Sequence, residues 1–208
     1  MVENLGKMDV TRDVIVVSGL PRSGTSMMMQ MLAAGGVPLV TDEARGPDPD
    51  NPRGYFEFDP VKRTAQDARW VGGAAGKAVK VIHLLLPDLP GGYRYRVIFM
   101  HRDVGEVLAS QEAMLRRRGR RGADLSPGQL AAAFSGQLRR VRAWLAGQAH
   151  FAVLDVPFAQ VIEDPAGQAA RVNQFLGGHL DEARMAAAVD PALHRQRPVG
   201  RVDGASGQ

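Results

Sequence analysis

Apolar residues occur along the chain in two kinds of pattern, which predict strands and helices in turn. Short, nearly unbroken apolar runs are typical of strands buried on both faces of a sheet, and they occur at 13–18, 77–86, 96–100 and 151–156. Apolar residues at the spacing of one helix face follow, in segments at 25–34, 61–71, 103–115, 126–146 and 164–176. A short terminal helix is expected within 179–196.

This alternation of strands and helices predicts the class of fold. We expect one α/β domain over 1–208, with a mostly parallel central sheet, helices on both faces and right-handed crossovers. The proline-rich and glycine-rich stretch at 41–58 is predicted to be an inserted loop. Its length exceeds that of most loops, which favours a functional role. The tail from about residue 198 is expected to be disordered.

The first predicted strand leads into a glycine-rich loop that has the features of a phosphate-binding site. Gly19 and Gly24 enclose the loop, and a helix with Met27, Met28, Met31 and Leu32 on one face follows. In such a loop, backbone N–H groups converge on an oxyanion and the helix N-terminus adds a favourable dipole. The alternative is an ordinary strand–turn–helix without a ligand, but the complete set of strand, glycines and helix favours anion binding.

The loop differs from that of nucleotide-hydrolysing proteins at one position. Gly19 to Ser26 fits the pattern G-x-x-x-x-G-T-S, so that Thr25 stands where a P-loop NTPase has its lysine. Arg22 is the cation of this loop. The absent lysine disfavours ATP or GTP chemistry, because that lysine neutralises the β- and γ-phosphates beside Mg²⁺.

A second anion site is predicted at the end of the strand at 96–100. Arg102 follows that strand, and its guanidinium can bind a phosphate bidentately. Asp103 is a suitable N-cap for the next helix, which carries Ser110 two turns further on. Alone, Arg102 would be a helix-cap or surface arginine and Ser110 a plain helix serine. Together with the first loop, they predict a nucleotide with two separate phosphates.

Composition excludes several other classes of protein. The 208 residues carry a net charge of +4, which is too small to indicate nucleic-acid binding but suits an anionic ligand. There is no cysteine, and thus no disulfide or thiolate chemistry. No apolar run reaches the ~18 residues that a membrane span needs, and the first residues lack a secretion signal. We therefore expect a cytoplasmic protein without stable membrane insertion.

The segments PRSGTS and VIFMHRDVGEVLAS resemble the two phosphate-binding motifs of the sulfotransferase family that uses 3′-phosphoadenosine 5′-phosphosulfate (PAPS). The resemblance covers nearly the whole chain and implies a P-loop-type three-layer fold. It also implies PAPS as donor, adenosine 3′,5′-bisphosphate as product and no required metal. By the same resemblance the cofactor contacts are Pro21, Arg22, Ser23, Gly24, Thr25, Ser26, Arg102, Ser110 and, from a basic C-terminal segment, Arg195.

The implied reaction needs cations for the leaving phosphate and a base for the acceptor hydroxyl or amine. Arg22 suits the first task, with Lys80 as a helper. Glu57 is the first candidate for the base, because it lies in the inserted loop between two phenylalanines, and Asp42 is the reserve. Further candidates for the base are Glu43, His83 and His101.

Three features of the function stay open at this stage. The acceptor is expected to be a small molecule that the sequence does not identify. The arginine run at 116–121 could hold an acidic partner or form a solvated loop. Two other functions also fit the pattern: a P-loop kinase of a nucleotide or small molecule, and a non-catalytic nucleotide-binding protein.

Overall fold

The computed structural model describes residues 12–42, 46, 48, 54–120, 122 and 124–190. Its centre is a five-stranded sheet with the strand order β2-β3-β1-β4-β5. All four strand pairs are parallel. The strands are β1 (Val14–Gly19), β2 (Leu39–Val40), β3 (Ala78–Lys80), β4 (Tyr95–His101) and β5 (Phe151–Pro157). The expected α/β fold with a parallel central sheet is therefore confirmed.

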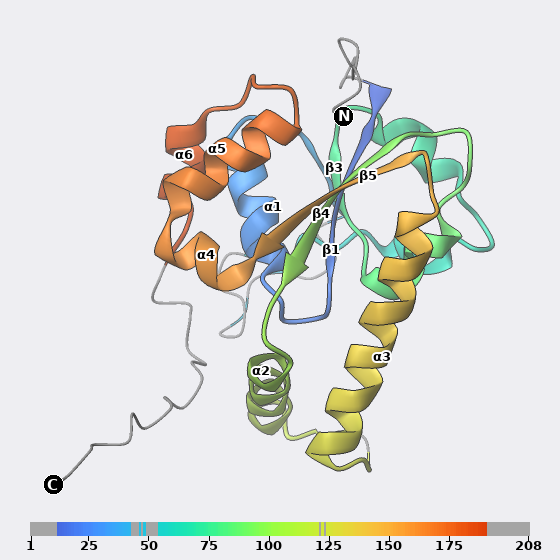
Figure 1. Cartoon of the computed structure of the whole chain (residues 1–208), viewed down its shortest axis with the longest axis vertical. Coiled ribbons are helices and arrows are strands. Elements are labelled where there is room, and N and C mark those ends of the chain that lie inside the picture. Colours follow the sequence, from blue (N-terminus) through green and yellow to red (C-terminus); the bar gives the residue numbers. More distant parts are fainter. Residues whose placement is uncertain are drawn as a thin grey trace, which may run out of the picture.

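Helices cover both faces of this sheet (Figure 1). One face carries α1 (Thr25–Ala34), α4 (Phe158–Glu163), α5 (Pro165–Phe175) and α6 (Glu182–Ala187). The long helix α3 (Pro127–Ala146) covers the other face. Helix α2 (Val104–Arg117) lies beyond the end of β4, below the sheet in the view of Figure 1. None of the described helices is long and apolar enough to cross a membrane.

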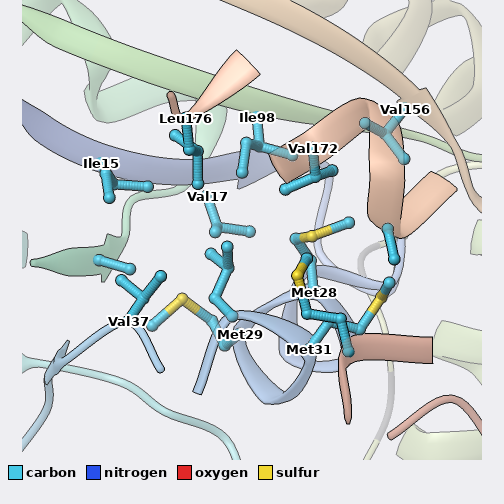
Figure 2. Close-up of a cluster of buried hydrophobic side chains, with 14 of the residues drawn as sticks. Ile15, Val17, Met28, Met29, Met31, Val37, Ile98, Val156, Val172 and Leu176 are labelled. Atoms are coloured by element: carbon cyan, nitrogen blue, oxygen red, sulfur yellow. The ribbon is translucent and has the colours of Figure 1, made fainter. Parts of the chain in front are cut away.

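The alternation of side chains in β1 supplies both halves of the core. Ile15 and Val17 pack with methionines of α1 and with α5, as Figure 2 shows. Val14 and Val16 point to the opposite face and pack with Val141 and other residues on the α3 side. All six residues of β1 are buried, as expected for the central strand of a parallel sheet covered on both faces.

Side-chain caps begin the later helices where the sequence predicts them. The Asp103 carboxylate accepts from the Glu106 amide at the start of α2. Ser126 forms a reciprocal capping box with Gln129, and Pro127 occupies the first turn of α3. Asp164 caps α5 with a single bond, in which its carboxylate accepts from the amide of Gly167. The sequence therefore predicts these three starts correctly.

The predictions for 61–86 are partly wrong. The expected helix at 61–71 is replaced by two short 3₁₀ segments, Asp59–Arg63 and Arg69–Ala74. The expected strand at 77–86 is limited to Ala78–Lys80, and a 3₁₀ segment, His83–Asp88, follows it. The apolar run was misleading because it includes surface side chains: Ile82 is 41% exposed and Leu84 47% exposed.

Candidate nucleotide-binding site

The loop between β1 and α1 has room for glycine alone at both ends. A Cβ atom on Gly19 would lie 2.5 Å from the Ser23 hydroxyl and 2.7 Å from the Met100 carbonyl oxygen. A Cβ atom on Gly24, whose φ is +97°, would lie 2.5 Å from the ring of Phe158. The main chain thus makes close approaches of the kind that phosphate-binding loops use. The buried hydroxyl of Ser23 has no hydrogen-bond partner among the described residues.

Arg22 connects the two phosphate sites that the sequence predicts separately. Its Nε atom donates to the hydroxyl of Ser110 over 3.1 Å, although the two residues are 88 positions apart. Its carbonyl oxygen accepts from Nη1 of Arg102, also over 3.1 Å. Arg22 itself has φ = +70°, a left-handed conformation that is uncommon for a residue with a Cβ atom. Arg22, Arg102 and Ser110 therefore lie together at the carboxyl ends of β1 and β4.

Arg102 is held on two further sides. Its Nε atom donates to Glu106 over 2.8 Å, and both side chains are about nine-tenths buried, at 8% and 10% exposed. Its guanidinium stacks on the ring of Phe158, 4.3 Å from the ring centroid. Sequence reasoning missed both Glu106 and Phe158. Glu106 had a visible signal, the spacing of four residues from Arg102 along one helix, whereas Phe158 had none.

Lys80 reaches the other side of the loop from the end of β3. Its Nζ atom donates to the hydroxyl of Ser26, in the first turn of α1, over 3.0 Å. It also donates to the carbonyl oxygen of Tyr55, which accepts a longer bond of 3.4 Å from Ser26. A lysine at the end of a buried strand needs such partners, because leaving its charge buried and unpaired is costly. The structure thus brings Lys80 and Ser26 together.

The two candidate carboxylates lie beside the edge strand β2. The amide of Asp42 donates to the carbonyl oxygen of Glu57 over 3.2 Å, so the two residues are neighbours. The Asp42 carboxylate accepts from the amide of Asp59 over 2.5 Å and so begins the next 3₁₀ segment. The Glu57 side chain is half-buried. The phenylalanines on either side of it pack against the two opposite core clusters.

The arginine run is in contact with the inserted loop. Arg118 Nη2 donates to Asp48 over 2.6 Å and to the Tyr55 hydroxyl over 3.1 Å. The same hydroxyl donates to Asp48 over 2.7 Å. Arg116 and Arg117 form the exposed last turn of α2. Arg116 and Arg117 are therefore helical, and Arg118, directly after the helix, joins the exposed run to the inserted loop. Arg121 lies outside the described residues.

The two candidate histidines have different environments. His83 is 2% exposed, with Nδ1 3.2 Å from the Gly19 carbonyl oxygen and Nε2 3.1 Å from the Gln137 side chain. Burial lowers the pKa of His83 below its usual value, so the neutral ring is favoured at pH 7. His101 Nε2 lies 2.6 Å from Asp155. Glu43 and Arg195 lie outside the described residues.

Asp155 is shared between His101 and Arg142. Arg142 bonds to both carboxylate oxygens, over 2.5 and 2.7 Å. Burial raises the pKa of Asp155, but the hydrogen bonds from Arg142 and His101 outweigh that effect and hold the pKa below its usual range. His101 is therefore bound into an ion-pair cluster at the ends of β4 and β5.

Comparisons with known proteins agree with this architecture. The sulfotransferase family model matches residues 75–182, just over half of the chain. The chain belongs to this family. The match covers β4, Arg102 and Ser110, whereas the loop at Gly19–Gly24 precedes it. No curated protein matches the chain significantly.

Solved structures of similar shape include the following three sulfotransferases. The sulfotransferase domain of the Synechococcus PCC 7002 olefin synthase matches 96% of this chain and 93% of its own length, with 17% identity and a TM-score of 0.53. The sulfotransferase domain from the curacin biosynthetic pathway matches 92% and 94%, with 14% identity and a TM-score of 0.52. Sulfotransferase STF1 of Mycobacterium tuberculosis H37Rv matches 86% and 71%, with 21% identity and a TM-score of 0.52. At these identities the similarity establishes the fold.

Proposed function

We propose that the protein transfers the sulfuryl group of PAPS to a hydroxyl or amine of a small-molecule acceptor and releases adenosine 3′,5′-bisphosphate. The observation that carries this proposal is the bond between Arg22 and Ser110. It joins the loop suited to a 5′-phosphosulfate with the helix suited to a 3′-phosphate. A nucleotide with phosphates at both positions requires two such sites side by side, whereas ATP does not.

The residues present fit a bisphosphorylated nucleotide. The glycines at both ends of the loop leave space for close approach of an oxyanion, and the buried Ser23 hydroxyl has no partner within the described part of the chain. Arg22, Lys80 and Arg102 bring three cations to the ends of β1, β3 and β4. From this arrangement Pro21 to Ser26 would hold the 5′ end, and Arg102 with Ser110 the 3′-phosphate.

The chemistry divides between cations and a base. As the acceptor oxygen or nitrogen forms its bond to sulfur, the bond from sulfur to the 5′-phosphate oxygen breaks, and negative charge builds on the leaving phosphate. Arg22 and Lys80 are the side chains that oppose this charge. A sulfuryl group carries less charge than a phosphoryl group, so the proposal includes no metal ion.

The acceptor's proton goes to a base on the protein. Glu57 is the proposed base, because it is half-buried and belongs to the inserted loop, whose Tyr55 carbonyl oxygen accepts from Lys80. Asp42 is less suitable, since its carboxylate caps the next segment. His83 is neutral and close to the loop, but its ring nitrogens face the Gly19 carbonyl oxygen and the Gln137 side chain.

Calorimetry with nucleotides tests the donor assignment. Adenosine 3′,5′-bisphosphate should bind in the presence of EDTA, and ATP with Mg²⁺ should bind far more weakly. Equal or tighter binding of ATP with Mg²⁺ would favour a kinase instead. Sulfate transfer from PAPS to a panel of phenols, sugars and amines then separates an enzyme from a non-catalytic nucleotide-binding protein.

A further inference from the structure

Arg102 contacts more of the loop than a simple 3′-phosphate ligand would need to. Its Nη1 atom donates to the main-chain carbonyl of Arg22, at the tip of the loop that binds the 5′ end. Glu106 holds the opposite part of the same guanidinium through Nε, over 2.8 Å. With its side chain only 8% exposed, Arg102 has little freedom to move away from these partners.

The main chain at Arg22 needs such support. Its φ of +70° lies in the left-handed region, which residues with a Cβ atom adopt only where the surroundings hold them. The bond from Arg102 fixes the direction of the Arg22 carbonyl. It thereby also fixes the Ser23 amide of the same peptide plane, which donates to the Leu20 carbonyl. The chain is then directed toward the amides at the start of α1, where loops of this kind hold an anion.

Phe158 provides a second connection between Arg102 and the loop. One face of the ring supports the guanidinium at 4.3 Å from the ring centroid. The ring edge also lies so close to Gly24 that a Cβ atom there would be 2.5 Å from it. A shift of Phe158 would therefore be felt by both the arginine and the end of the loop.

We propose that Glu106 and Phe158 are positioning residues that hold Arg102 as a brace for the 5′ loop, so that the two phosphate sites are mechanically coupled. The functional part of this inference rests on the proposed nucleotide site. If Arg102 served only the 3′-phosphate, disturbing it would leave ligands without that phosphate unaffected. With the brace, disturbing Glu106 weakens binding of adenosine 5′-monophosphate as well.

The test compares Glu106→Ala with a matched control on the same helix. Glu112 also pairs with an arginine four residues away, Arg116, but both side chains are 75% exposed. Glu106→Ala should weaken adenosine 5′-monophosphate about tenfold by calorimetry, the effect of losing one charge-assisted hydrogen bond. Glu112→Ala should leave it unchanged. Glu106→Gln keeps an acceptor for Nε and should restore most of the affinity.

Hydrogen exchange in the nucleotide-free protein tests the brace independently of any ligand. The Ser23 amide donates to the Leu20 carbonyl within the loop and serves as the reporter. Its exchange should accelerate about tenfold in Glu106→Ala, with the midpoint of urea unfolding compared alongside. Phe158→Leu gives a second variant, with the same direction expected, should Glu106→Ala fail to fold.

The outcomes separate the two proposals. Faster loop exchange without any nucleotide binding would keep the brace and overturn the proposed function. Unchanged Ser23 exchange in folded Glu106→Ala and Phe158→Leu would overturn the brace. Equal acceleration in Glu112→Ala would also overturn it, because the effect would then belong to the helix as a whole.

Discussion

Gly24→Ala should destabilise the protein by more than backbone strain alone can explain. Gly24 precedes α1 with φ = +97°, and a Cβ atom there would lie 2.5 Å and 3.1 Å from two ring carbons of Phe158. Gly36, just after the same helix, also has φ = +97°, but a Cβ atom there would meet nothing within 4 Å. The pair therefore separates the cost of the conformation from the cost of the contact.

The expected difference follows from these two geometries. The left-handed conformation costs an alanine about 1–2 kcal/mol at either position. Lower entropy of the unfolded chain offsets about 0.4–1 kcal/mol of this at both. Only Gly24→Ala also forces atoms into a packed ring, which adds about 1–3 kcal/mol. The free energy of unfolding should thus fall by about 1–3 kcal/mol more in Gly24→Ala than in Gly36→Ala.

Urea unfolding followed by tryptophan fluorescence measures both variants against the parent protein. The double variant Gly24→Ala/Phe158→Leu removes the ring and should recover part of the loss caused by Gly24→Ala. An equal decrease in the free energy of unfolding for Gly24→Ala and Gly36→Ala would show that the Phe158 ring moves aside without an energetic penalty. Absence of any recovery in the double variant would likewise refute the steric argument.

Three other outcomes are expected. Burial lowers the pKa of His83 below its ordinary 6.5, so the unfolded chain binds the extra proton more readily than the folded chain. The free energy of unfolding should therefore fall as the pH drops below 6.5. Urea unfolding of His83→Gln should show a flatter pH dependence than that of the parent protein. Lys80→Met should lower turnover of PAPS by ~10²–10³-fold, measured with one acceptor, if Lys80 opposes charge on the leaving phosphate. Glu57→Gln should keep bisphosphate affinity while turnover falls by ~10²–10⁴-fold; near-normal turnover would place the base elsewhere, with Asp42→Asn as the matched comparison.

The elements that the sequence predicts correctly have strong local signals. The strand β1, the glycine loop and α1 are specified within 21 residues, because a buried apolar run, two glycines and a helix period follow one another directly. The starts of α2, α3 and α5 are each marked by a capping side chain. Such features need no knowledge of the rest of the fold.

The region from 59 to 88 shows where local reasoning fails. Its apolar residues serve two purposes: Val71, Val79 and Leu86 are buried, whereas Ile82 and Leu84 are exposed. Periodicity cannot distinguish these groups, because the chain is broken into short 3₁₀ segments and a three-residue strand. The conformation of these short segments depends on how they pack against the sheet, and that packing cannot be predicted from the local sequence.

The candidate site shows the same division between local motif and tertiary contact. Each predicted phosphate motif is recognisable by itself, but whether the two motifs lie together depends on which strands are neighbours. In the sheet β1 lies beside β4, with Gly19 aligned with Met100. The two strands therefore end level, and Arg102, two residues past Met100, meets the loop that begins after Gly19.

Glu106 follows one helical turn after Arg102, and Phe158 comes from the end of β5, the strand on the far side of β4. A one-residue shift in the pairing of β1 with β4 would turn Arg102 to the other side of the sheet edge. The proposed bisphosphate site therefore depends on the register of these two strands more than on either motif.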